Sequence, residues 1–256
     1  MRDEQFELHA RIEEAHWWFR GRRSIINRIA GHVLPASCRG MIIDIGCGTG
    51  ANLAALASDH DCLGIDVSEN AIRLARQRFS NVEFLHSDLR HLAVPAYQGP
   101  RLWLLLDVLE HVEDDISFFS TILSVMEEND HLLMTVPANM SLWSPHDAAH
   151  GHYRRYHRAM LEKLWKGREV TVIFVTYFNF FLFPIIYAVR AYNRLRKKEW
   201  GEAGTDLDLP GPWLNGVLES IFSSEGAILE YLMKRGRRTG WPFGVSLMAL
   251  LRKGSK

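Results

Sequence analysis

Short apolar runs alternate with segments of helical periodicity from residue 41 to about residue 176. Runs of the buried-strand type occupy residues 41–46, 62–66, 82–88, 101–107, 131–136 and 169–177. Between them, apolar residues recur at helical spacing in 51–58, 69–79 and 114–128. Strands and helices that alternate in this way are joined by right-handed crossovers into a mostly parallel sheet with helices on both faces. The pattern predicts a Rossmann-like α/β fold.

Two parts of the chain lie outside this alternation. The N-terminal part is helical, aromatic and charged, and residues 178–241 separate the sixth strand from a last apolar run at 245–251, which we interpret as a seventh strand. A connection of this length is too long for a loop, so it must contain helices, which we expect at 185–198 and 213–235. We divide the chain into an N-terminal helical lid (1–40), a core (41–177), a helical insertion that caps the acceptor (178–241), and the last strand with a tail (242–256).

The most apolar stretch, residues 170–189, has the length of a bilayer span, about 20 residues. Its first half is β-branched and aromatic, Asn179 lies in the middle, and Pro184 interrupts the second half. A buried strand followed by an apolar helix explains the same stretch of residues, and this is the interpretation we adopt. A true membrane span and peripheral contact with a membrane are the alternatives.

Composition and charge narrow the class of protein. The 256 residues contain 30 Lys and Arg and 30 Asp and Glu, with 47% apolar residues. A net charge of zero argues against a nucleic-acid-binding protein, which is normally basic. The three cysteines, Cys38, Cys47 and Cys62, form no CxxC pair, as is typical of a reducing compartment. The first residues contain no apolar core of a signal peptide, so we expect a cytoplasmic protein.

The most informative motif is the glycine-rich turn in residues 42–53, IIDIGCGTGANL. A strand runs into Gly46, Gly48 and Gly50, and a helix follows. Glycines let the backbone approach a ligand closely, and the start of a helix offers unpaired N–H groups. The spacing differs from the dinucleotide fingerprint GxGxxG because Ala51 occupies the last glycine position. The turn therefore indicates a nucleotide-like ligand, with a tight strand–helix turn as the alternative.

Three aspartates follow the ends of the first three strands. Asp44 precedes the glycines and is placed to hold an amine, Asp66 can bind both hydroxyls of a ribose, and Asp88 can accept from an adenine amino group. Open α/β sheets bind ligands at this edge. The alternative for Asp66 and Asp88 is that they cap the helices that follow.

At these residues the chain resembles the class I S-adenosylmethionine (SAM)-dependent methyltransferases. DIGCGTG is similar to the family's first motif, GIDVS to its ribose-binding motif and SDL to its adenine-side motif. LLLDVLEHV (104–112) resembles the branch that contains the ubiquinone-biosynthesis O-methyltransferases. The resemblance implies SAM as cofactor and S-adenosyl-L-homocysteine (SAH) as product. It places the cofactor on Asp44, Gly46, Cys47, Gly48, Gly50, Asn52, Asp66, Val67, Ser87, Asp88, Leu89, Asp107 and Val108.

The N-terminal segment EEAHWWFRGRR (13–23) gives the cofactor site a candidate lid. Methyltransferases of the type it resembles cover SAM with an N-terminal helix. We therefore expect Trp18 and Arg23 to lie over the cofactor and to meet its carboxylate or shield its methyl group. The alternative is an aromatic helix that only docks on the sheet.

Two clusters are candidates for the chemistry of methyl transfer. Asp107, Glu110 and His111 share one face if a helical turn begins there, which offers Glu110 or His111 as a general base. In the loop PANMSLWSPHDAAHGHYRRYH, His146 and His150 are further candidates for a base. A divalent metal site and a purely structural role are the alternatives for both clusters. We assign no metal.

These motifs predict a methyltransferase that acts on oxygen or carbon of a small, mainly hydrophobic acceptor, such as a natural product or an isoprenoid intermediate of secondary metabolism. We expect the insertion to lie away from the glycine turn and to bind the acceptor with Phe180, Phe181, Phe183, Ile185 and Tyr187. A run of basic residues, Arg190, Arg194, Arg196, Lys197 and Lys198, is usually a solvated face, and beside this apolar surface the alternative is contact with an anionic end of the acceptor or with an acidic membrane. The alternatives are a peripheral-membrane enzyme acting on a lipid-linked sugar or quinone precursor, and a non-catalytic SAM-binding protein. The sequence does not indicate the oligomeric state.

Overall fold

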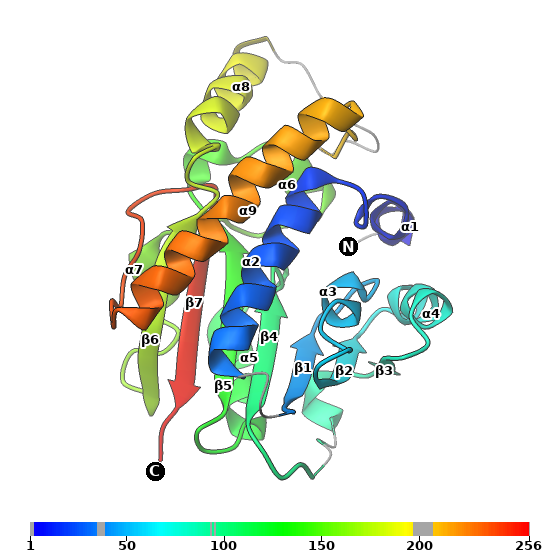
Figure 1. Ribbon diagram of the computed structural model, residues 1–256, viewed down its shortest axis with the longest axis vertical. Coiled ribbons are helices and arrows are strands. Elements are labelled where there is room, and N and C mark those ends of the chain that lie inside the picture. The colour runs from blue at the N-terminus through cyan, green and yellow to red at the C-terminus, as the bar shows by residue number, and fades with distance from the viewer. Residues whose placement is uncertain (1–2, 35–38, 93, 95, 197–206, 256) are drawn as a thin grey trace.

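A computed structural model describes residues 3–34, 39–92, 94, 96–196 and 207–255. Its centre is a seven-stranded sheet of order β3-β2-β1-β4-β5-β7-β6, which Figure 1 shows edge to edge behind two long helices. The strands are β1 (Met41–Ile45), β2 (Asp61–Asp66), β3 (Glu83–His86), β4 (Arg101–Leu106), β5 (His131–Pro137), β6 (Val170–Phe178) and β7 (Ser246–Lys253). The predicted Rossmann-like fold is confirmed.

Strand direction follows from the connections. β1 pairs in parallel with β2 and β4, β2 with β3, and β4 with β5. These pairings are parallel because a helix or a helical turn returns the chain between successive strands. β7 runs antiparallel to both β5 and β6, with Leu133 opposite Leu250 and Val175 opposite Ala249. The strands β1, β4, β5 and β7 are buried on both faces over nearly their whole length, which explains their nearly continuous apolar sequence.

Each face of the sheet is covered by helices. On one face, Ile25, Ile26 and Ile29 of α2 (Trp17–Val33) pack with Phe222 and Leu229 of α9 (Pro212–Lys234) against the strands. On the other face lie α5 (Asp115–Val125), which contributes Phe119 and Ile122, and α7 (Arg158–Glu162), which contributes Leu161. Figure 1 shows α2 and α9 lying side by side across the front of the sheet.

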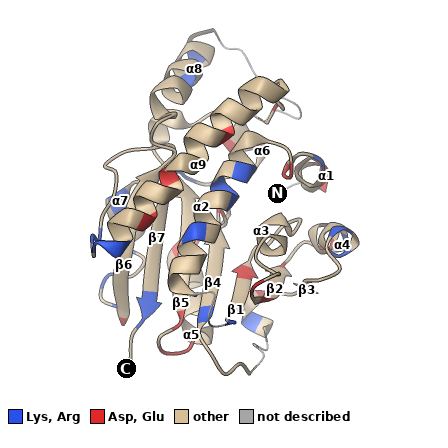
Figure 2. Cartoon of the chain, viewed as in Figure 1, with Lys and Arg blue, Asp and Glu red and all other residues tan. Residues whose placement is uncertain are grey.

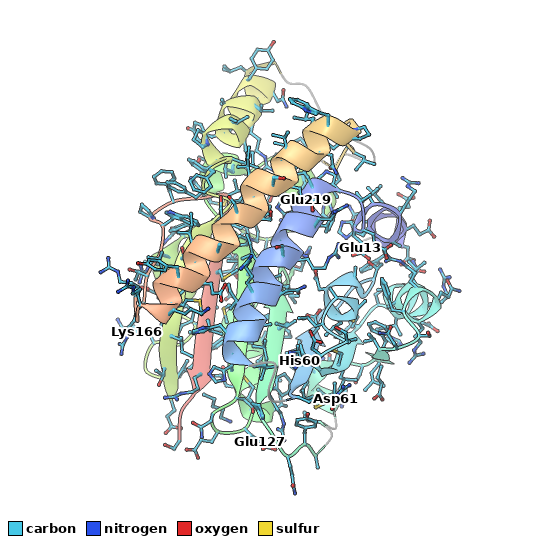
Figure 3. All side chains as sticks on the ribbon, viewed as in Figure 1. Glu13, His60, Asp61, Glu127, Lys166 and Glu219 are labelled. Atoms are coloured by element: carbon cyan, nitrogen blue, oxygen red, sulfur yellow. The ribbon has the colours of Figure 1, made fainter. Side chains whose placement is uncertain are left out.

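A glycine lets these two front helices approach each other. A Cβ on Gly21 of α2 would lie 2.6 Å from the Phe222 ring of α9. Larger residues at this position would push the helices apart. Figure 3 labels Glu219 near this crossing, where it accepts a hydrogen bond from Arg20 at 3.0 Å.

The shorter helices begin where capping residues stand. Ser68 accepts from the Ala71 N–H at 3.2 Å, as expected for the start of α4 (Glu69–Arg78). α3 (Ala51–Ala54) is shorter than the expected helix 51–58, because turns follow it. The remaining helices are α1 (Asp3–Ile12), η1 (Leu89–His91), η2 (Leu109–His111), η3 (Met140–Leu142) and α6 (Pro145–Ala149), of which the η elements are 3-10 helices.

The apolar stretch 170–189 divides as predicted into strand β6 and the beginning of α8 (Phe183–Arg196). Among the described residues, no helix combines the length and apolar content needed to cross a membrane. α8 and α9 lie between β6 and β7, as expected of an inserted helical segment. Lys197 and Lys198, in the expected helix 185–198, and Cys38 lie outside the described residues.

Candidate functional site

A cavity of about 970 Å³ lies where β1, β2, β4, β5 and β6 end. Its walls come from distant parts of the chain: the turn after β1, the N-terminal helices, the loop after β5, and both helices of the insertion. The expectation that the insertion lies away from the glycine turn is wrong. Ile186 of α8 and Leu218 of α9 line the same cavity as Gly46 and Gly48, because α9 packs along α2, which reaches over the turn.

The glycine turn faces this cavity with its backbone. Gly46 and Gly48 have φ angles of 72° and 54°, in the left-handed region that favours glycine. A Cβ on Gly46 would lie 2.6 Å from Val108 Cγ2, whereas a Cβ on Gly48 would meet nothing within 4 Å. Gly48 therefore borders open space in which a ligand can contact the peptide backbone.

Asp66 is fixed beside this turn. It is 8% exposed, and its two oxygens accept from the Gly48 N–H at 2.9 Å and from the Ser68 N–H at 2.8 Å. Burial raises the pKa of Asp66, and these backbone hydrogen bonds oppose the shift. Each carboxylate oxygen can accept a second hydrogen bond, so Asp66 can bind neighbouring hydroxyls of a ribose. The glycine-lined space and this carboxylate fit the nucleoside part of SAM.

Asp44 lies beneath the turn and is not part of the cavity wall. It is 1% exposed, and neither carboxylate oxygen has a hydrogen-bond partner among the described residues. Burial raises the pKa of Asp44 to about 8; the nearby Arg22 opposes this and Asp66 adds to it. The carboxyl group therefore carries a proton over most of the neutral range.

Asp88 caps a helix, as the alternative interpretation proposed. Its Oδ1 accepts from the Arg90 N–H at 2.9 Å, and its Oδ2 accepts from the Arg90 side chain at 2.6 Å. These bonds lower the pKa of Asp88 to about 2. Asp88 and its neighbours Ser87 and Leu89 do not line the cavity.

The N-terminal lid contributes Arg22, which sequence reasoning missed, in place of Arg23. Arg22 is 6% exposed, lines the cavity, forms an ion pair with Asp107, and lies 4.5 Å above the Trp18 ring. Arg23 points elsewhere and donates to the Glu13 carbonyl at 2.8 Å. Consecutive residues of a helix point about 100° apart, so the docking of α2 decides which arginine faces inward.

Glu13 ties the lid to the glycine turn and was also missed. It accepts from the Thr49 hydroxyl at 2.6 Å and forms an ion pair with Arg78 of α4. Figure 3 labels Glu13 at the inner end of α1. Since Glu13 and Thr49 both line the cavity, this contact closes its edge between the lid and the turn.

The cluster after β4 sits in a 3-10 turn. Glu110 is 1% exposed, and its Oε2 has no partner among the described residues. Burial and the charge of Asp107 raise the pKa of Glu110 well above its ordinary value. Burial and His152 lower the pKa of His111 to about 3. Burial thus favours the protonated form of Glu110, and His111 is uncharged at neutral pH.

The loop after β5 is braced by Asp147. This buried carboxylate accepts from Arg155 Nε at 2.8 Å and from the Ser144 N–H at 2.9 Å, and lies 3.0 Å from His152 Nδ1. Burial raises the pKa of Asp147, but the bonds from His152 and Arg155 outweigh it and lower the pKa overall. His146 and His150 stack beside them, with ring centres 4.2 Å apart, and burial lowers the pKa of both.

The cavity brings together many of the sequence-predicted residues but not all of them. It is lined by Trp18, Gly46, Cys47, Gly48, Asn52, Asp66, Val67, Asp107, Val108, Glu110, His111, His146 and His150. Arg23, Asp44, Gly50, Ser87, Asp88 and Leu89 are outside its wall. Glu110, His111 and His152 offer ligand atoms within 4.8 Å of one another, and these are the described residues that could hold a metal ion. Asp107, expected in that set, pairs with Arg22 instead.

The insertion supplies the apolar wall of the cavity. Leu182, Ile185, Ile186 and Val189 line it. Of the expected residues, only Ile185 does so; Phe180, Phe181, Phe183 and Tyr187 pack in a separate aromatic group with Trp241 and Phe243. The sequence shows their apolar character but not which way α8 turns them.

Comparisons with known proteins agree with these features. Residues 42–129 match the family model of a methyltransferase domain. A trans-aconitate 2-methyltransferase from Rhodopseudomonas palustris (strain HaA2) is 26% identical over 110 residues, 42% of each chain. A protein named "Probable S-adenosylmethionine-dependent methyltransferase" from Mycolicibacterium smegmatis is 26% identical over 136 residues, 52% of this chain and 50% of the relative. The chain thus spans about half or less of the length of these relatives.

Among solved structures, the plantazolicin methyltransferase BpumL in complex with a pentazolic desmethylPZN analog and SAH has a similar fold. The TM-score is 0.56 at 14% sequence identity, and the match covers 98% of this chain and 91% of that chain. At this level of identity the likeness concerns the fold alone.

Proposed function

We propose that this chain, whose residues 42–129 match the family model of a methyltransferase domain, is a class I SAM-dependent methyltransferase that transfers a methyl group from SAM to oxygen or carbon of a small, mainly hydrophobic molecule. The observation that carries the proposal is one cavity with two chemically different halves. The glycine turn and Asp66 border one half, and the apolar side chains of α8 and α9 border the other. A natural product or an isoprenoid intermediate has the apolar character of the second half.

SAM, when bound, supplies a methyl group on a positively charged sulfur that is open to attack by a nucleophile. In our proposal, Asp66 and the backbone at Gly48 hold the nucleoside, while Arg22 and Trp18 cover it from the lid. Val67, Asp107 and Val108 border the same half of the cavity. Enclosure by α2 and α8 keeps water from the reacting groups and holds them at a productive distance.

We assign the removal of the acceptor proton to His152, which also lines the cavity. Its Nδ1 faces the Asp147 carboxylate at 3.0 Å, so Nδ1 carries the hydrogen and Nε2 is left to take a proton. Asp147 is itself held by Arg155 and Ser144, which makes the pair rigid. Glu110 is a weaker candidate for the base because burial and the charge of Asp107 raise its pKa and so favour its protonated form.

His152→Asn tests this proposal, because the asparagine amide can still donate to Asp147 but cannot accept the proton. With tritium-labelled SAM and small-molecule extract of the source cells, we expect the turnover number to fall about 100- to 10,000-fold. SAH affinity, measured by calorimetry, should change less than about threefold. The matched control is His91→Asn, since His91 is exposed and outside the cavity. Undiminished turnover in His152→Asn would assign the base elsewhere, and wild type that binds no SAH would contradict the function itself.

We also propose that the transfer requires no metal ion. Asp107, the second carboxylate expected in the cluster after β4, pairs with Arg22, so the candidate set offers one carboxylate, Glu110, beside two histidines, whereas magnesium prefers oxygen ligands. The same assay after treatment with EDTA should show full turnover. Loss of turnover that magnesium restores would reverse this assignment.

A second candidate is methylation of a lipid-linked precursor at a membrane surface. Ile185, Tyr192 and Leu195 of α8 are 61%, 52% and 85% exposed, and Trp213 at the start of α9 is 80% exposed. Figure 2 shows α9 as mostly uncharged, with acidic positions along its length and basic residues at its C-terminal end. Sedimentation with lipid vesicles distinguishes this candidate from an enzyme of the cytoplasm. We favour the cytoplasm, which the free thiols of Cys47 and Cys62 support.

A further inference from the structure

Asn179 is a buried polar residue in the acceptor half of the cavity, and no described residue forms a hydrogen bond with its side chain. It follows β6 directly, lines the cavity and is fully buried. Neither its side-chain oxygen nor its side-chain nitrogen has a hydrogen-bond partner among the described residues. Burying such a group without a hydrogen bond lowers the stability of the fold by roughly 1–3 kcal/mol, so stability does not explain an asparagine at this position.

The backbone at this position does not explain the side chain. Asn179 has a φ of 55°, which asparagine tolerates, but glycine adopts the same angle more readily. Two other asparagines have similar angles: Asn129 is exposed, and Asn139 accepts a hydrogen bond from the Ser141 N–H at 3.1 Å. Among these three, only Asn179 buries an unpartnered amide.

Glu225 of α9 fixes the turn that carries Asn179. This fully buried carboxylate accepts from the Phe181 N–H at 2.9 Å, and the backbone N–H groups of Asn179 and Phe180 also point to it. From the other side, the chain before β7 comes close: a Cβ on Gly244 would lie 2.4 Å from the Phe178 carbonyl oxygen. The Asn179 backbone is therefore held from two directions, which makes Glu225 a positioning residue.

The surroundings of Asn179 within the cavity are mainly apolar. Leu182 and Ile186 line the wall just beyond it in the chain, and Val245 lines the wall on the β7 side. A ligand that packs its apolar surface against this wall can form a hydrogen bond between a polar group of its own and Asn179. A carboxamide offers both donors and an acceptor in one plane.

We propose that Asn179 recognises the acceptor by pairing with a group that both donates and accepts hydrogen bonds. The acceptor is then an amphiphile with a hydroxyl or an amide near the end that enters the cavity, and an apolar remainder against α8. This inference rests on the proposed function, since it names the substrate class of the same site. It assigns no role to Asn179 in cofactor binding.

The test is Asn179→Gly, which removes the amide and keeps the left-handed backbone accessible. With tritium-labelled SAM and small-molecule extract of the source cells, we expect the amount of extract needed for half-maximal label transfer to rise about 10- to 100-fold. SAH affinity by calorimetry should stay within about threefold of wild type. The matched control, Asn129→Gly, makes the same change at an exposed left-handed position and should behave as wild type.

Asn179→Asp serves as the second variant, because it keeps the shape of the side chain but replaces the two N–H donors of the amide by at most one hydroxyl donor. It should also raise the half-saturating amount of extract. An unchanged value in either folded variant would overturn the inference, as would a parallel loss of SAH affinity. The acceptor, identified by mass spectrometry of the labelled product, must carry a hydroxyl or an amide, and an acceptor without either would equally overturn it. Wild type that binds no SAH or transfers no label would instead contradict the proposed function.

Discussion

Asp66 combines two tasks in one side chain: it fixes the glycine turn, and it faces the cavity that the turn borders. Charged hydrogen bonds to a ligand are worth roughly 1.5–3 kcal/mol. Asp66→Ala should therefore weaken SAM binding, measured by calorimetry, by about 10- to 100-fold. Asp66→Asn keeps one acceptor oxygen for the Gly48 N–H and should lose less affinity. A folded alanine variant with unchanged affinity would contradict the ribose assignment.

At the scale of single residues, the sequence predicted the type of chemistry better than the direction of side chains. The positions of Gly46, Gly48 and Asp66 follow from where strands end, because parallel strands deliver their carboxyl ends to one edge. Arg22 and Asn179 could not be predicted. The first depends on the rotation of α2 about its axis and the second on how α9 places Glu225. The ion pair of Arg22 with Asp107, and an Asn179 amide that has no hydrogen-bond partner among the described residues, become visible only in the folded structure.

At the scale of elements, the strands could be predicted because each is a short apolar run bounded by polar or turn residues. The insertion was predicted as two helices, yet its location was wrong. That location depends on contacts far apart in the sequence, such as Gly21 with Phe222 of α9. The contact brings α9 along α2 and over the cavity. Helix–helix packing of this kind depends on shape at a few positions, which periodicity does not reveal.

The placement of α8 predicts that its inner face selects the acceptor. Ile186 lines the cavity, whereas the next residue, Tyr187, does not. Ile186→Ala removes apolar surface worth about 1–2 kcal/mol, so the amount of acceptor extract needed for half-maximal transfer should rise roughly 5- to 30-fold. SAM affinity should stay within about threefold. Tyr187→Ala is the control and should leave both quantities unchanged. Equal effects of the two substitutions would favour a purely structural helix.

At the scale of the whole molecule, two hydrophobic layers enclose the sheet, and several buried ionisable groups lie around the cavity at the ends of its strands. These groups act on stability in opposite directions. Burial lowers the pKa of His9 and His111 to about 3, which favours folding as pH rises toward the ordinary histidine range. Burial raises the pKa of Glu225 to about 7, which opposes folding as pH rises. The pH dependence of the free energy of unfolding is the sum of the histidine and carboxyl effects, so a substitution at one of these groups is needed to separate them.

Glu225→Gln isolates the contribution of one buried carboxyl to the free energy of unfolding. In the unfolded chain Glu225 ionises near its ordinary pKa of 4.5, whereas the folded protein keeps the proton until about pH 7. The protonated group therefore favours the folded state fully below pH 4.5, and this advantage is lost as pH rises to 7, at about 1.4 kcal/mol per unit. Glutamine keeps an acceptor oxygen for the Phe181 N–H and does not titrate.

Urea unfolding at pH 5, 6, 7 and 8 measures this difference. Relative to wild type, Glu225→Gln should gain stability from pH 5 to pH 7, by an amount on the order of 2–3 kcal/mol, and should gain little more at pH 8. Ser224→Ala, at the exposed neighbouring position, should give a constant offset from wild type at every pH. A constant offset for Glu225→Gln as well would mean that the carboxyl is ionised in the folded protein. The turn that carries Asn179 would then be held by an ionised Glu225 carboxylate and not by a neutral carboxyl group.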